Sequence, residues 1–204
     1  MRIGAIVLCG GKSSRMGTSK AMLPFGPELM LERVVRLIGQ VVDMDQIVVV
    51  AAQCQPLPNL SDRVLVVHDA RPERGPLEGL AAGLRALADR VDAVYVTGCD
   101  VPRIVPAFVE CMFALLETHS IAVPRDGEFF HPLAAVYRTS VLPHVHQLLA
   151  ADRLRLSFLA QELDTREVDT NILRAVDPSL VTLQNLNTHE DYAAALLACG
   201  FELP

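Results

Sequence analysis

Long apolar runs and an excess of basic residues are both missing from this chain of 204 residues. No stretch approaches the roughly 20 apolar residues that a membrane-spanning helix needs, so no membrane association is expected. Acidic residues number 24 against 18 lysines and arginines, which gives a formal net charge of -6. Binding to nucleic-acid backbone or to anionic lipid needs clustered Lys and Arg, so neither partner is expected.

Paired cysteines are also missing. The five cysteines are odd in number and contain no C-x-x-C pair, which excludes the spacing of a disulfide framework or a zinc finger. They are Cys9, Cys54, Cys99, Cys111 and Cys199. The apolar run at residues 3–9 is too short for the hydrophobic region of a signal peptide. We therefore expect a reducing, cytoplasmic compartment, with the cysteines at strand ends acting as small buried apolar side chains.

Repeats, low-complexity tracts and long linkers are absent as well. With 51% hydrophobic and 21% charged residues the chain can bury a full core. Its length matches the usual size of one domain, and residues 1–204 are predicted to form a single domain.

What the sequence does contain is an alternation of strand and helix patterns. Apolar, β-branched runs predict buried parallel strands at residues 3–10, 46–53, 63–69 and 93–100. Helical spacing of apolar residues predicts helices at 28–42 and 77–91. This order is typical of a three-layer α/β/α fold with a mostly parallel, doubly wound sheet.

The second half of the chain departs from that alternation. Residues 125–138 read as two extended runs around a turn at Asp126 and Gly127, which predicts an antiparallel excursion. Further predicted elements are helices at 140–150 and 154–163, a last strand at 179–187, and a closing helix at 188–200 that Thr188 caps and Gly200 ends.

Candidate functional residues follow the predicted strands. Gly10 and Gly11, Asp69 and Asp100 each come just after a strand. Ligands of open α/β sheets bind at the carboxyl ends of the strands, so we expect these residues on one edge. Two carboxylates there suit a divalent cation such as Mg²⁺.

The segment at residues 9–20, CGGKSSRMGTSK, has the small and basic residues of a phosphate-binding loop. It is not a Walker A loop, because Ile6 stands where the first glycine belongs, and it does not supply G-x-G-x-x-G. Its glycines allow close backbone approach, and Lys12, Arg15 and Lys20 can neutralise a polyphosphate. A nucleoside triphosphate fits this segment better than a dinucleotide.

Five segments in order now resemble a known family. They are LCGGKSSRMGTSKAML from Leu8, RGPLEGLAAGL from Arg74, GCDVP from Gly98, DGEFFHPLAAVYR from Asp126 and NLNTHEDY from Asn185. Together they resemble the nucleotidyltransferases of the molybdenum cofactor guanylyltransferase type, which share the fold of sugar-nucleotide (nucleotide-diphospho-sugar) transferases. The resemblance covers nearly the whole chain.

The resemblance implies that the terminal phosphate of molybdopterin attacks the α-phosphate of GTP and releases pyrophosphate. It also implies roles for ten residues. The backbone of Leu8, Cys9, Gly10 and Gly11 would contact the nucleotide, Arg15 and Lys20 would bind phosphates, Asp69 would contact the nucleotide, Asp100 would ligate Mg²⁺, and Asn185 and Asn187 would contact the pterin. Arg15, Lys20 and Asp100 are the expected catalytic residues. Cofactor delivery or acceptor proteins are possible partners.

Departures from the family pattern leave alternatives open. Gly10 resembles the guanine-using relatives, whereas Ala51 stands where close relatives have an asparagine that contacts the nucleotide. Ser19 replaces an aspartate that could orient Lys20. The alternatives are a CTP-dependent cofactor or sugar-phosphate nucleotidyltransferase of the same fold and a nucleotide- or cofactor-binding protein without transfer activity. Arg74 either lines the pterin side or is an ordinary exposed loop arginine.

Overall fold

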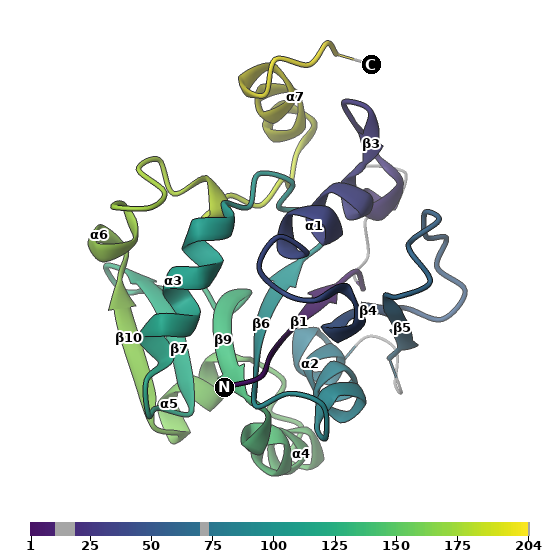
Figure 1. Ribbon diagram of the computed structural model, residues 1–204. Coiled ribbons are helices and arrows are strands. Elements are labelled where there is room, and N and C mark those ends of the chain that lie inside the picture. Colours follow the sequence, from purple (N-terminus) through teal and green to yellow (C-terminus); the bar gives the residue numbers. More distant parts are fainter. Residues whose placement is uncertain (11–18, 70–73, 204) are drawn as a thin grey trace.

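The computed structural model describes residues 1–10, 19–69 and 74–203, and Figure 1 shows them arranged around one twisted sheet. The strand order is β10-β7-β9-β6-β1-β4-β5, and β8 pairs with β7 off this path. A separate two-stranded hairpin joins β2 (Pro24–Phe25) to β3 (Glu28–Leu29).

The parallel centre of the sheet confirms the four predicted strands. It contains β1 (Ile3–Leu8), β4 (Ile47–Ala51), β5 (Leu65–His68) and β6 (Ala93–Gly98). The last residue of β1, Leu8, pairs with Val50 on one side and with Gly98 on the other. The carboxyl ends of β1, β4 and β6 therefore lie side by side, along what we call the carboxyl edge.

The prediction that residues 63–69 form a buried strand was wrong in one respect. In the part of the chain that the structure describes, strand β5 pairs with β4 alone and forms one edge of the sheet, and Leu65 and Val66 are 37% and 38% exposed. An apolar run does not reveal whether both flanking positions in a sheet are filled, because strand order is set by connections elsewhere in the chain.

The antiparallel excursion is confirmed. It consists of β7 (Ile121–Asp126), β8 (Phe129–Phe130) and β9 (Ala134–Arg138), with Gly127 at a φ of 58° in the turn. Strand β9 lies between β6 and β7 and is antiparallel to both, so β7 again runs in the direction of β6. Strand β10 (Thr165–Asp169) pairs in parallel with β7.

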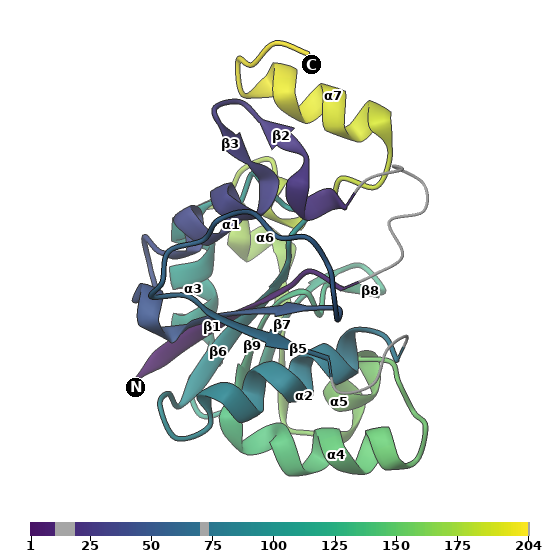
Figure 2. The ribbon, with the colours of Figure 1, turned by 90° about the vertical axis from the view of Figure 1, so that its right-hand side faces the viewer.

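Helices cover both faces of the sheet, as Figure 2 shows, which confirms the three-layer α/β/α fold. One face carries α1 (Met30–Ile38), α3 (Pro106–Leu116) and α6 (Thr170–Leu173). The other carries α2 (Pro76–Leu87), α4 (Leu142–Ala150) and α5 (Ser157–Glu162). Short 3₁₀ helices lie at Lys20–Met22, Met44–Gln46, Thr139–Val141 and Val181–Leu183. No helix within the described ranges is long and apolar enough to cross a bilayer.

The predicted last strand at 179–187 is wrong. The chain turns there into the 3₁₀ helix Val181–Leu183, because the buried Asp177 carboxylate accepts the backbone N–H of Val181 and Thr182 at 3.0 and 2.9 Å. The strand that closes the sheet is the largely charged β10 instead. Side-chain acceptors that bond nearby backbone N–H groups compete with strand pairing, and an apolar pattern does not show them.

The closing helix is confirmed as α7 (His189–Ala198), and Gly200 follows it at a φ of 76°. Thr188 and Asp191 form a capping box at its start. Figures 1 and 2 show α7 at one end of the molecule against the β2–β3 hairpin. Tyr192 packs edge-on against Phe25, and its hydroxyl bonds to the carbonyl of Pro24. A small third core therefore attaches the end of the chain to its beginning.

Candidate functional site

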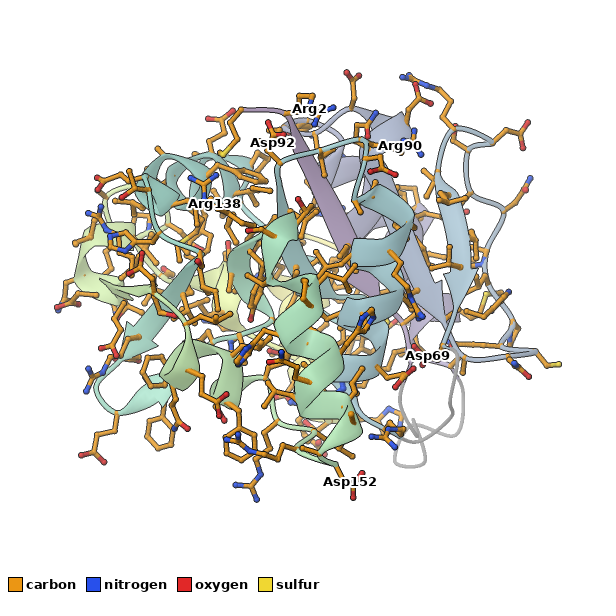
Figure 3. All side chains as sticks on the ribbon, turned by 90° about the horizontal axis from the view of Figure 1, so that it is seen from below. Arg2, Asp69, Arg90, Asp92, Arg138 and Asp152 are labelled. Atoms are coloured by element: carbon orange, nitrogen blue, oxygen red, sulfur yellow. The ribbon has the colours of Figure 1, made fainter. Side chains whose placement is uncertain are left out.

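The residues after β1, β5 and β6 lie together on the carboxyl edge, as predicted. Sheet pairing continues one step beyond each strand: Cys9 N–H donates to Val50 O (2.8 Å), Cys99 N–H to Leu8 O (3.0 Å) and Asp69 N–H to Ala51 O (3.1 Å). Figure 3 shows Asp69 at the end of the sheet opposite to Arg2 and Asp92. Gly10 and Asp100 follow immediately after these pairs.

Four predicted site residues form one hydrogen-bonded cluster. Lys20 Nζ donates to Asp100 Oδ2 at 2.9 Å and to Asn187 Oδ1 at 3.0 Å. Asn185 Nδ2 donates to the other carboxylate oxygen, Asp100 Oδ1, at 3.0 Å. The side chains of Lys20 and Asp100 are only 17% and 16% exposed. A cation, a carboxylate and two amides from three distant segments are thereby held at one place, which we call the lysine–aspartate cluster.

The local chain geometry explains how the two asparagines reach Asp100. Leu186, between them, is buried in the third core and donates its N–H to the backbone O of Asp100 at 2.9 Å. The Asp191 carboxylate accepts the N–H of Asn187 and Thr188, and these bonds hold the pKa of Asp191 below its usual range. The helix cap therefore also fixes the segment that carries the asparagine side chains.

Gly98 makes room for the Asp100 carboxylate. A Cβ at position 98 would lie 2.6 Å from Asp100 Oδ1, closer than such atoms approach. Any larger residue would displace the carboxylate from Lys20 and Asn185. The glycine at the end of β6 is thus part of the site, because the absence of a side chain leaves space for the Asp100 carboxylate.

Asp69 lies in a different environment, against glycines. Its Oδ2 would be 3.1 Å from a Cβ at Gly10, and its Oδ1 would be 3.4 Å from one at Gly79. Asp69 Oδ1 is buried and has no hydrogen-bond partner within the described residues. Burial raises the pKa of Asp69, the nearby Glu78 raises it further, and His68 opposes them. Among the described residues, Oδ1 is therefore a free acceptor close to the start of the predicted nucleotide loop.

Asp69→Asn should raise the thermal stability of the free protein at neutral pH. A carboxyl group whose pKa is raised on folding favours the folded state below the unfolded pKa and loses that contribution as the pH rises. We expect a Tm increase of at most about 2–4 °C, the equivalent of about 1 kcal/mol, and less after solvent screening.

Thermal unfolding of both proteins between pH 3.5 and pH 7.5 measures this difference. It should shrink as the pH falls through about 4, the ordinary pKa of an aspartate. The exposed Asp62→Asn is the matched control. A difference that does not change with pH would contradict the assignment to ionisation.

The two cysteines at the carboxyl edge are buried, at 6% exposure each. A hydrogen bond with the Cys99 thiol raises the pKa of Cys9 well above its usual value, and burial and the negative charge of Asp100 add to this. The Cys9 thiol therefore stays protonated and unreactive, and Cys99 is equally buried. The expectation that they act as small apolar side chains is therefore confirmed.

One side chain at the site, Gln55, was not predicted from the sequence. Gln55 donates from Nε2 to the backbone O of Cys9 at 3.0 Å and to Ser19 Oγ at 3.2 Å, and its Oε1 accepts the N–H of Ala52 at 3.1 Å. Gln55 lies in the loop after β4, outside every periodic pattern and outside the five family-like segments. No sequence signal identified it.

Some predicted residues remain untested. Gly11, Lys12 and Arg15 lie outside the described residues, so their roles stay predictions. Leu8 and Cys9 are in place at the end of β1, and Ala51 is buried at the end of β4.

Arg74 is not an ordinary exposed loop arginine, because its side chain is only 20% exposed, and its place beside the pterin stays a prediction. It contacts the end of α4 through the backbone O of Leu149 and the carboxylate of Asp152.

The lysine–aspartate cluster has the donor chemistry of a magnesium site. Mg²⁺ is commonly held by one or two carboxylates together with water and substrate phosphates, all through oxygen. The Asp100 carboxylate and the side-chain oxygen of Asn187 are such donors, and they surround one ammonium group. No group of three or more His, Cys, Asp or Glu suited to a metal exists within the described ranges. The available ligand set fits an ion shared with a polyphosphate.

Comparisons with known proteins agree with this geometry. The family described as the MobA-like NTP transferase domain matches residues 5–166. Relatives named "Probable molybdenum cofactor guanylyltransferase" occur in Methanosarcina mazei, at 36% identity over 92% of this chain and 87% of theirs, and in Mycobacterium marinum, at 36% identity over 94% and 92%.

A solved structure of molybdopterin-guanine dinucleotide biosynthesis protein A from Archaeoglobus fulgidus has the same fold. Its TM-score is 0.79 at 20% identity, and the match covers 98% of this chain and 99% of that one. The family match spans most of the chain and contains Lys20, Asp69 and Asp100. The chain therefore belongs to the family of MobA-like NTP transferase domains.

Proposed function

We propose that this protein transfers GMP from GTP to the terminal phosphate of molybdopterin, with Mg²⁺, and releases pyrophosphate. The observation that carries the proposal is the lysine–aspartate cluster, in which Lys20, Asp100, Asn185 and Asn187 meet at the carboxyl edge. The names of the relatives indicate guanine as the base and the molybdenum cofactor as the acceptor. We place the reaction in the cytoplasm, with cofactor delivery or acceptor proteins as partners.

The bond changes need no general base. A terminal phosphate oxygen of molybdopterin, already ionised at neutral pH, forms a bond to the α-phosphorus of GTP. The bond from that phosphorus to the oxygen bridging to the β-phosphate breaks, and pyrophosphate leaves with the electron pair. Catalysis of this kind depends on positioning and on neutralising charge around the transferred phosphorus.

Lys20 is suited to neutralise that charge. Its ammonium group is largely buried and is oriented by two acceptors at 2.9 and 3.0 Å. An oriented cation in a site with little water stabilises a developing negative charge more strongly than an exposed one. Magnesium bound at Asp100 would supply further positive charge to the phosphate oxygens.

Asn185 and Asn187 are suited to bind the pterin. Both are exposed, while Leu186 between them is buried, so the two amides project from a fixed backbone. Each amide has donor and acceptor groups beyond the bonds to Asp100 and Lys20. A pterin ring carries a matching set of donors and acceptors along its edge.

Asp69 supports a nucleotide as the other substrate. Its Oδ2 lies beside Gly10, and its buried Oδ1, beside Gly79, has no hydrogen-bond partner among the described residues, so Oδ1 can accept a hydrogen bond from a hydroxyl or an N–H of a ligand. A buried acceptor that stays unpaired costs free energy, and a ligand that satisfies it gains affinity. Gly10 and Asp69 together would form the nucleotide side of the site.

The test is a transfer assay with the purified protein. Pyrophosphate release and the dinucleotide product are measured with molybdopterin and each of GTP, CTP and ATP, with and without Mg²⁺. We expect release only with GTP, molybdopterin and Mg²⁺ together. Product formation with CTP instead would contradict the choice of base, with Ala51 as the first residue to examine.

A binding measurement accompanies the assay. Thermal unfolding with Mg²⁺-GTP at a hundred times its Kd should stabilise the protein by about 2.7 kcal/mol. Stabilisation by GTP with no transfer under any condition would contradict the enzymatic proposal and favour a binding protein.

A further inference from the structure

Gln55 connects three segments that meet at the carboxyl edge. Its amide bonds the end of β1 through Cys9 O, the residue before Lys20 through Ser19 Oγ, and the end of β4 through Ala52 N. The turn at 52–55 directs the side chain back to the sheet: Gln55 N–H donates to Ala52 O at 3.2 Å, and Cys54 adopts a φ of 59°. The side-chain amide of Gln55 therefore makes three hydrogen bonds: its oxygen accepts one, and its NH₂ group donates two.

Ser19 links Gln55 to Lys20, because it bonds to Gln55 and directly precedes Lys20 in the chain. Its backbone O accepts the N–H of Met22 at 2.9 Å, so Ser19 begins the 3₁₀ turn Lys20–Met22. Its side chain caps nothing in that turn and bonds to Gln55 instead. The position of the Lys20 backbone, and with it the reach of Nζ to Asp100, depends on where Ser19 is held.

We infer that Gln55 is a positioning residue, which acts through Ser19 to place the Lys20 ammonium group in the lysine–aspartate cluster. The inference rests on the proposed function for the role of Lys20 in transfer.

The first test needs no turnover. The chain has only two lysines, Lys12 and Lys20, so acylation of each by an amine-reactive ester can be followed by peptide mass spectrometry. Lys20 should react slowly in the unaltered protein, because its side chain is 17% exposed and bonded to Asp100. Gln55→Ala should increase the rate at Lys20 severalfold.

The matched control is Gln53→Ala. Gln53 has the same side chain, lies two residues away in the same loop and is exposed. We expect it to leave the reactivity of Lys20 unchanged. Gln55→Glu is a second variant that keeps the acceptor for Ala52 N–H and removes the donors to Cys9 and Ser19, and it should also expose Lys20. Unchanged reactivity in both Gln55 variants, with the fold intact by circular dichroism, would overturn the inference.

The second test measures transfer. Gln55→Ala should lower kcat by on the order of 10–100-fold, the effect of a small misplacement of a catalytic group. KM for GTP should change much less, because charge on the α-phosphate develops in the transition state. In a Lys20→Ala background the same substitution should have almost no further effect, since a residue that acts through Lys20 has nothing left to position.

Independent, multiplicative losses in that double variant would show that Gln55 acts elsewhere and would overturn the inference. Different results would overturn the proposed function and the positioning role of Gln55. An unaltered protein that transfers nothing contradicts the proposed function, while the acylation rates still decide whether Gln55 positions Lys20.

Discussion

Lys20→Met lowers kcat for GMP transfer by about 10²–10³-fold, the usual effect of removing one preorganised donor from a developing negative charge. Methionine keeps most of the length and the apolar stem of lysine, so packing changes little. The ammonium group that bonds Asp100 Oδ2 and Asn187 Oδ1 is lost. Steady-state kinetics with GTP and molybdopterin measure the effect, and KM for GTP should change less than kcat.

Arg2→Met is the matched control for a lost cation. Arg2 also forms an ion pair, with Asp92 at 2.9 Å, but its side chain is 62% exposed and lies at the opposite end of the sheet (Figure 3). Exposed pairs contribute little, about 0–1 kcal/mol, so kcat should not change. Equal losses in both variants would mean that overall destabilisation, and not catalysis, explains the Lys20 result.

Asp100→Asn removes the Mg²⁺ dependence of the protein together with at least about 99% of its activity, the rate equivalent of roughly 2.7 kcal/mol. The substitution keeps the shape that fits against Gly98 and removes only the charge. The amide keeps an oxygen but lacks the negative charge with which a carboxylate binds Mg²⁺, and it leaves Lys20 without its ionic partner. Titration of Mg²⁺ at fixed GTP, read by both kcat and Tm, measures the loss.

Asp92→Asn is the control, because Asp92 has an arginine partner too and lies far from the carboxyl edge. It should titrate with Mg²⁺ as the unaltered protein does. If Asp100→Asn kept a normal Mg²⁺ response, the ion would have to be held by other groups, and the assignment of Asp100 as its ligand would be wrong.

Much of the fold was predictable because its signals are local. Apolar runs predicted the parallel strands β1, β4, β5 and β6, although not that β5 lies at an edge, and the S/T-x-x-acidic pattern at Thr188 predicted the start of α7. Helix α3 was not predicted, although Pro106 stands at its first turn, because its apolar residues lie on most sides and show little periodicity. Strand β10 was missed because it is short and largely charged.

The site was predictable to a different extent. The position of Gly10, Asp69 and Asp100 on one edge follows from the strands alone. The approach of Asn187 to Lys20, 167 positions away in sequence, was not predicted, because the family resemblance gave Asn187 only as a contact to the pterin. Gln55 could not be predicted at all, because a loop side chain that bonds two backbone groups and one serine hydroxyl leaves no repeating pattern in the sequence.

The separation between Lys20 and Asn187 has a consequence for the synthesis of the protein. A ribosome produces the nucleotide-facing elements first, and the chain can begin to fold from its N-terminal part. The segment that bonds Lys20 and supports the backbone of Asp100 emerges only with residues 185–191, which α7 and its cap then hold in place. When β1 and β6 have emerged from the ribosome, the nascent chain can form the carboxyl edge but not the lysine–aspartate cluster. We expect the protein to become competent for transfer only when α7 docks.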